Sequence, residues 1–194
     1  MTKDRPWGRM LGLALSAGTA LAQQPPLAAK LLPARSEISF VSKQMGVPVE
    51  GKFTRFDAQI VLDPRAPETG RVALAIDTGS AAFGAPELDS ELPKPTWFDT
   101  PKFPQATFQS NSIKAAGTGK FEVTGTLAIK GVSRDVRVPV ALARGADNVS
   151  TASGSFTIKR LDFKIGDGEW ADASLLANDV QVKFKLALSG LPSY

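Results

Sequence analysis

Residues 180–188 read Val-Gln-Val-Lys-Phe-Lys-Leu-Ala-Leu, and this stretch decides the fold. Every second residue from Val180 to Leu188 is large and apolar, whereas the residues between them are polar, charged or small. Successive side chains of a β-strand point to opposite faces of the sheet. The alternation therefore predicts a strand with one buried and one solvated face.

The same period of two recurs through most of the chain, with turn residues such as Asp63-Pro64 between the runs. The further runs are residues 38–40, 49–53, 56–62, 72–76, 106–110, 121–129, 132–142 and 155–165. About eight such runs, each too short for a buried helix, predict an all-β fold, either an antiparallel barrel or a sandwich. A barrel has the advantage that it leaves no unpaired edge.

One helical insert interrupts the strands at residues 86–100. Residues 87–92 favour a short helix that follows Pro86, and Pro93, Pro95 and Pro101 exclude a longer one. Residues 166–172 form a second irregular segment, which carries Trp170. Both segments have the length of a lid or a loop at a barrel end.

Composition excludes several classes of function. The 194 residues, 43% of them hydrophobic, suffice for one domain, and the chain has no cysteine and no histidine. Disulfides, thiolate or Ser-His-Asp catalysis, and zinc sites built on Cys or His are thereby excluded. We therefore expect a protein that is not an enzyme and holds no metal. Dispersed lysines and arginines without interleaved aromatics also argue against nucleic acid as a partner.

The first 22 residues have the pattern of a secretory signal peptide. Arg5 and Arg9 precede an apolar run of about a dozen residues, and Ala20-Leu21-Ala22 supplies small residues before a cut at Gln23. Removal of this segment lowers the formal net charge from +4 to +2, because Lys3, Arg5 and Arg9 leave together with Asp4. We expect a periplasmic product in which residues 23–35 form an irregular lead-in.

Five groups of residues carry a resemblance to a known family. They are Ser36-x-Ile38-x-Phe40, Val49-x-Gly51-x-Phe53-x-x-Phe56, Trp97-Phe98-Asp99-x-x-x-Phe103-Pro104-x-x-x-Phe108-x-Ser110, Val123-x-Gly125-x-Leu127-x-x-x-Gly131 and Arg160-x-Asp162-Phe163. In this order and spacing they resemble the YceI-like family of periplasmic polyisoprenoid-binding proteins. The resemblance implies that residues 36–190 form an extended, eight-stranded, lipocalin-like antiparallel barrel around a long apolar pocket. Gly51 and Gly125 lie inside strands, where glycine is typical of a bulge or of sharp coiling.

Candidate ligand contacts follow from the strand faces and the irregular segments. We expect ten residues to contact a ligand: Phe40, Phe53, Ile76, Trp97, Phe98, Phe108, Leu127, Phe156, Phe163 and Trp170. Trp97, Phe98 and Trp170 are the candidates for the barrel mouth, and Lys43 and Arg160 are candidates for binding a polar head group. The alternative is that the aromatics fill a solid core and that the two cations pair on the surface.

The expected function is to carry or store a linear polyisoprenoid or quinone-type lipid, with that lipid as a bound ligand and without a catalytic cofactor. The alternative is a non-catalytic envelope protein with a solid barrel that docks a membrane redox partner. The oligomeric state stays open, and a homodimer is one of the arrangements that the sequence allows.

Overall fold

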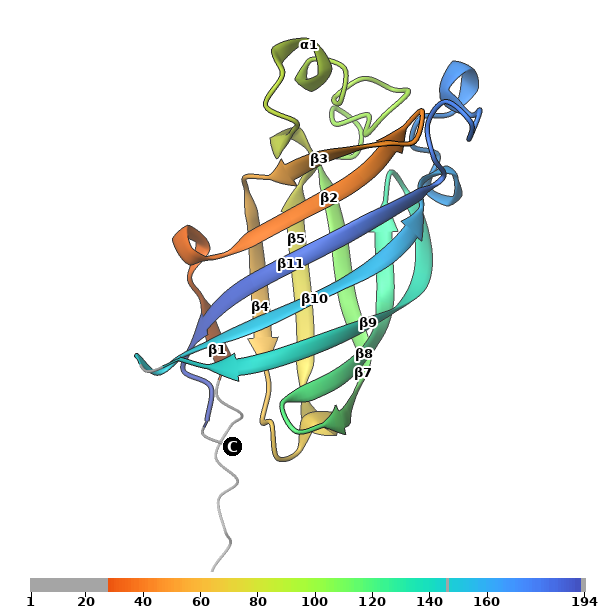
Figure 1. Cartoon of the computed structure of the whole chain (residues 1–194). Coiled ribbons are helices and arrows are strands. Elements are labelled where there is room, and N and C mark those ends of the chain that lie inside the picture. Colours follow the sequence, from red (N-terminus) through yellow and green to blue (C-terminus); the bar gives the residue numbers. More distant parts are fainter. Residues whose placement is uncertain (1–27, 146, 193–194) are drawn as a thin grey trace, which may run out of the picture.

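The computed structural model describes residues 28–145 and 147–192 as one antiparallel sheet that closes on itself (Figure 1). The strands are β1 (Ala28–Leu31), β2 (Glu37–Gln44), β3 (Val47–Phe53), β4 (Phe56–Val61), β5 (Arg71–Asp77), β6 (Ala81–Ala82), β7 (Gln105–Gly117), β8 (Lys120–Ile129), β9 (Val132–Arg144), β10 (Val149–Lys159) and β11 (Asp179–Ser189). The ring runs β1-β4-β5-β7-β8-β9-β10-β11 and closes where β11 pairs with β1. The predicted all-β fold, an eight-stranded antiparallel barrel with a short helical insert, is confirmed.

At three of the eight ring positions the strand is interrupted, so that two shorter strands share the position: β1 with β2, β3 with β4, and β5 with β6. Both β1 and β2 pair with β11, at Lys30–Leu31 and at Glu37–Val41, and the 3-10 turn η1 (Pro33–Arg35) separates them. In the same way, β3 pairs with β2 and β6, whereas β4 pairs with β1 and β5. The upper part of this wall, β2-β3-β6, is thus a separate flap of sheet that β11 connects to the ring.

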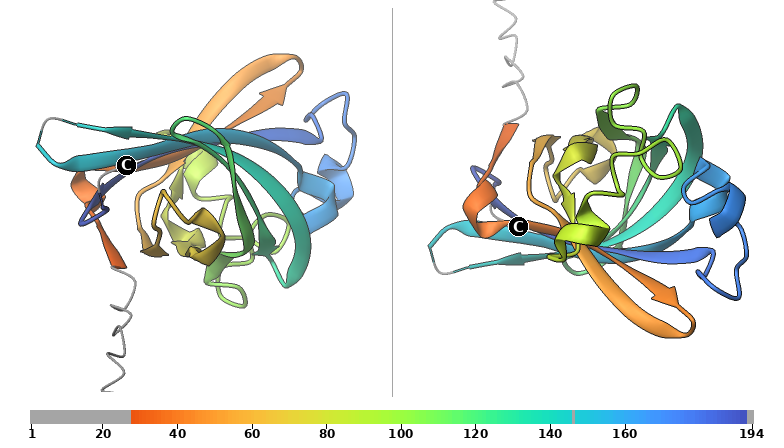
Figure 2. Two further views of the ribbon diagram at one scale, coloured as in Figure 1. Left: turned by 90° about the horizontal axis from the view of Figure 1, so that it is seen from below. Right: turned by 90° about the horizontal axis from the view of Figure 1, so that it is seen from above.

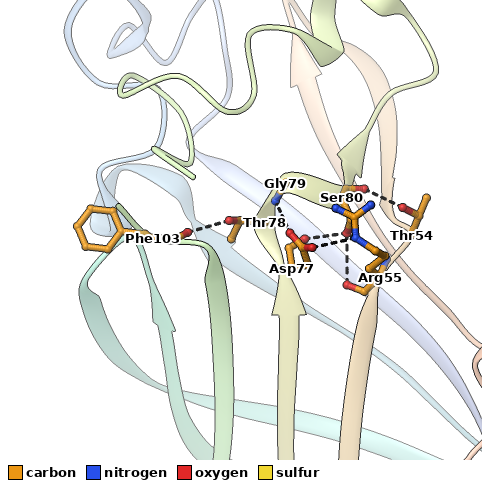
Figure 3. A network of polar contacts seen from close by, with 7 residues as sticks. All are labelled: Thr54, Arg55, Asp77, Thr78, Gly79, Ser80 and Phe103. Carbon is orange, nitrogen blue, oxygen red and sulfur yellow. Dashed lines mark hydrogen bonds and ion pairs between the residues drawn. The ribbon is translucent and has the colours of Figure 1, made fainter. Parts of the chain in front are cut away.

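A network of hydrogen bonds joins the β3–β4 interruption to the neighbouring β5–β6 interruption (Figure 3). The Arg55 Nε donates to the Asp77 carboxylate at 2.8 Å, and the Arg55 backbone N–H donates to Ser80 Oγ at 3.0 Å. The buried Thr78 hydroxyl donates to the Phe103 carbonyl at 2.8 Å. Thr78 and Ser80 belong to the 3-10 turn η3 (Thr78–Ser80). Their hydroxyls form hydrogen bonds with backbone groups where the backbone pairing between strands is interrupted.

The irregular segments gather at one end of the barrel. The insert, defined as residues 83–104, contains α1 (Pro86–Asp89) and lies over this end when the barrel is viewed from above (Figure 2). The mouth loop, defined as residues 164–178, and the β2–β3 hairpin lie at the same end (Figure 1). The mouth loop follows η4 (Arg160–Phe163) and contains η5 (Gly168–Trp170). At the opposite end lies η2 (Pro67–Thr69). None of the helices in the described part of the chain has the length and apolar character to cross a bilayer.

Three expectations for local structure need correction. The lead-in was predicted to be irregular, but Ala28–Leu31 forms β1, and residues 23–27 lie outside the described residues, as does the predicted signal peptide. The run at 155–165 belongs to a strand that spans Val149–Lys159, and η4 follows it. The predicted helix at 87–92 is a single turn, Pro86–Asp89.

In-strand glycines make room for phenylalanine rings on neighbouring strands. A Cβ on Gly51 would collide with the Phe40 ring, one on Gly125 would lie 2.6 Å from Phe108, and one on Gly154 would lie 2.7 Å from Phe184. The β7–β8 register shifts beside Gly125, as the predicted bulge requires. The ladder at Gly51 is regular, so of the two predicted features, a bulge or sharp coiling, no bulge lies there, and the glycine accommodates the ring.

Candidate functional site

The barrel encloses an apolar cavity of about 370 Å³. Along β11 its wall consists of every second residue: Val180, Val182, Phe184, Leu186 and Leu188. Eight residue steps of about 3.3 Å on a strand tilted by about 40° give a length of about 20 Å along the barrel axis. A cavity of this volume and length is narrow, and it suits one slender chain better than a compact ligand.

Nine of the ten predicted contact residues line this cavity: Phe40, Phe53, Ile76, Trp97, Phe98, Phe108, Leu127, Phe156 and Trp170. The exception is Phe163, which is buried in the core beside the mouth and is not part of the cavity wall. It lies in η4, where the backbone has left the strand, so the alternation that predicted an inward position no longer applies.

Aromatic side chains from distant segments meet at the mouth. The rings of Trp97, in the insert, and Trp170, in the mouth loop, have their centroids 5.7 Å apart. Phe98 packs edge-on against Phe53, with 5.9 Å between the ring centroids. The three residues predicted for the mouth therefore contact either one another or the upper barrel wall. The sequence pattern missed Phe83, Leu88 and Leu92, which also line the cavity from the insert, where no strand period signals their orientation.

Arg160 is fully buried, and its side chain organises the mouth loop. Its Nε donates to the Ala177 carbonyl, Nη1 to the carbonyls of Ile165 and Gly166, and Nη2 to those of Trp170 and Leu176. A guanidinium has five N–H donors, and all five are thus engaged. Burial lowers the pKa of Arg160 from its ordinary value, yet the group stays charged because that value is so high. Arg160 lines the cavity, but it has no donor left for the head-group role predicted for it.

The second predicted head-group residue, Lys43, points away from the cavity. Its neighbours Ser42 and Gln44 line the cavity, so the strand alternation places Lys43 on the outer face, where it is exposed. The prediction that Lys43 binds a head group is therefore wrong in position. Lys130, near the same end, donates its Nζ to the Lys164 carbonyl, and burial lowers the pKa of this amine.

The polar side chains in the cavity wall all lie near the mouth. They are Ser42, Gln44, Glu91 and Arg160. Gln44 forms a backbone bridge with Leu176 of the mouth loop, and the Leu176 carbonyl accepts from Arg160 at 2.7 Å. Glu91 lies in the insert, where Lys94 pairs with it at 2.5 Å. Across residues 28–145 and 147–192, no group of three or more His, Cys, Asp or Glu side chains is placed to hold a metal ion.

Comparisons with known proteins agree with this architecture. Residues 30–188 match the family described as YceI-like domain. A UPF0312 protein of Pseudomonas aeruginosa is 31% identical over 134 residues, which cover 66% of this chain and 70% of that protein.

Among solved structures, BcnA of Burkholderia cenocepacia is 42% identical, with a TM-score of 0.79 over 81% of this chain and 99% of that one. A polyisoprenoid binding domain from Saccharophagus degradans shares the fold at 18% identity, with a TM-score of 0.66 over 84% and 98% of the two chains. The eight-stranded barrel, its cavity and the match over residues 30–188 together place the chain in the YceI-like family.

Proposed function

We propose that this protein binds one linear isoprenoid lipid, either a polyprenyl chain or a quinone with an isoprenoid tail, inside its barrel. The narrow apolar cavity, about 370 Å³ in volume and running along the barrel, is the observation that carries the proposal. This volume falls within the range of about 300–1,000 Å³ that is usual for small-molecule sites. Burying several hundred Å² of ligand at about 25 cal/mol per Å² gives on the order of 10 kcal/mol before association costs.

One structural neighbour supports the same ligand class. The Saccharophagus degradans domain is named for binding polyisoprenoids, and it shares this fold. We propose that export by the predicted signal peptide places the present protein in the periplasm, where it carries or stores such a lipid.

We also propose that the protein is a binding protein and not a catalyst. The sequence offers no histidine or cysteine. Of the two charged groups in the cavity wall, Arg160 is engaged by backbone carbonyls and Glu91 by Lys94. The alternative, a solid barrel that docks a membrane redox partner, requires side chains to fill the interior, and the cavity favours the lipid-binding function over it.

Native mass spectrometry and solvent extraction of the purified protein test the proposal. We expect a co-purifying isoprenoid mass on the wild type, and its loss from Leu127→Trp, which fills the cavity from β8. The matched control is Gln181→Trp, because Gln181 is exposed between two residues of β11 that line the cavity. Overpacking costs roughly 1–3 kcal/mol, so thermal melts must show that both variants are folded.

Two results would overturn the proposal. One is a wild-type protein that carries no lipid and also fails to bind an added isoprenoid. The other is a folded Leu127→Trp variant that retains as much lipid as Gln181→Trp does.

A further inference from the structure

The polar groups at the mouth differ in what they can still bind. Arg160 has no free N–H donor, and the Glu91 carboxylate is already paired with Lys94. Lys43 is on the outer face, and Lys130 and Lys94 are not among the residues that line the cavity. Within the described residues, the cavity wall therefore presents no cation with a free donor to a bound molecule.

This arrangement disfavours an anionic head group. A phosphate that entered the mouth would lose hydration without gaining a charged partner. An uncharged head group loses far less hydration free energy on entering the mouth.

Ser42 and Gln44 are the wall residues that can still form hydrogen bonds. Neither side chain forms a hydrogen bond with another described residue. Both face the cavity from the C-terminal end of β2. Ser42 is 9% exposed and Gln44 is half-buried, so bulk water reaches them only in part. A hydroxyl and a primary amide can each both donate and accept.

We propose that Ser42 and Gln44 bind the uncharged oxygen-bearing head group of the ligand, a hydroxyl or a carbonyl, with the isoprenoid tail directed into the barrel. This inference rests on the proposed function and narrows it, because it selects neutral isoprenoids over their phosphates. The hydrogen bonds orient the ligand, while the apolar wall below them supplies the binding energy.

Three probes with one tail test the inference: geranylgeraniol, geranylgeranyl monophosphate and the hydrocarbon with the same skeleton. Binding is followed through the fluorescence of Trp97 and Trp170 at the mouth. On the wild type we expect the alcohol to bind about tenfold more tightly than either the hydrocarbon or the monophosphate. In Ser42→Ala/Gln44→Leu the alcohol should fall to the affinity of the hydrocarbon, whose own binding stays unchanged.

Lys43→Gln is the matched control, because the Lys43 side chain lies on the opposite face of β2, between Ser42 and Gln44. This variant should bind the three probes in the same order of affinity as the wild type. A monophosphate that binds as tightly as the alcohol, or a double variant that keeps its preference for the alcohol, overturns the head-group inference alone. If the wild type binds none of the three probes, the proposed function itself fails.

Discussion

Replacing Arg160 with methionine tests whether the guanidinium holds the mouth loop in place. The substitution keeps an apolar side chain of similar length and removes all five donors. Two of the lost hydrogen bonds, to the carbonyls of Gly166 and Leu176, are buried, and the other three are partly exposed to water. A buried carbonyl without a partner costs about 1–3 kcal/mol, whereas water replaces the partners of the exposed ones at small cost. Two such carbonyls lose their partner, so we expect a loss of about 2–6 kcal/mol in the free energy of unfolding.

Urea unfolding followed by circular dichroism measures this loss, and amide hydrogen exchange locates it. Exchange should accelerate most in residues 164–178, whose carbonyls Arg160 joins. Arg160→Lys keeps the charge but has only three donors, so it should lose part of the stability. Lys159→Met, at the exposed neighbouring position, should stay within about 0.5 kcal/mol of the wild type. A loss below about 1 kcal/mol in Arg160→Met, with unchanged exchange in the mouth loop, would refute the reasoning.

Three further predictions concern the cavity, its mouth and the loop that joins β9 to β10. Gly51→Ala should drive the Phe40 ring out of its position, lower the free energy of unfolding by about 1–3 kcal/mol and reduce lipid retention. Adding Phe40→Leu to this variant should restore both the stability and the lipid retention. Additive effects of the two substitutions would contradict the steric explanation. Trp170→Ala removes the partner of Trp97, so a fluorescent isoprenoid should leave faster in stopped-flow measurements with the circular dichroism unchanged; an equal off-rate would show that the ring does not cover the ligand. The hydrogen bond from Arg35 holds the pKa of the exposed Asp147 carboxyl below its usual range. This contact therefore stabilises the fold at a pH above the unfolded-state pKa, and the stabilisation is lost as the pH falls through the folded-state pKa. Arg35→Ala should raise the Asp147 pKa in an NMR titration, and an unchanged Asp147 pKa would show that the contact does not form in solution.

The barrel could be predicted from the sequence wherever one face alternates strongly, as in β11 and β8. The strand β1 could not be predicted, because only two of its residues, Ala29 and Leu31, are buried and because prolines flank the segment. In β10 the first residues, Val149 to Gly154, are mostly small and look like a turn, while Leu161 and Phe163 continue the apolar period into a segment that the backbone folds as η4. Local pattern cannot distinguish these cases, because pairing with β9 and β11 decides them.

The candidate site was predictable to the extent that it follows strand phase. Extending the period of Ile38 and Phe40 by two steps places Ser42 and Gln44 inside and Lys43 outside, so the sequence did contain the signal that corrects the head-group prediction. Arg160 is different in kind. Its five acceptors come from residues 165–177, which no periodicity relates to one another, and only the folded loop brings their carbonyls together.

The closure between β1 and β11 sets the order in which the protein can assemble. The pairs Lys30–Ser189 and Leu31–Leu188 join residues from opposite ends of the chain. A polypeptide that emerges from its N-terminus can therefore form the β7–β8 and β8–β9 hairpins early, but it cannot close the ring until the last strand has been made. Pairings between such distant residues form slowly, because the intervening chain must first be ordered. Until then the apolar faces of the wall are open to water, so the last strand to be made is also the one that shields the interior.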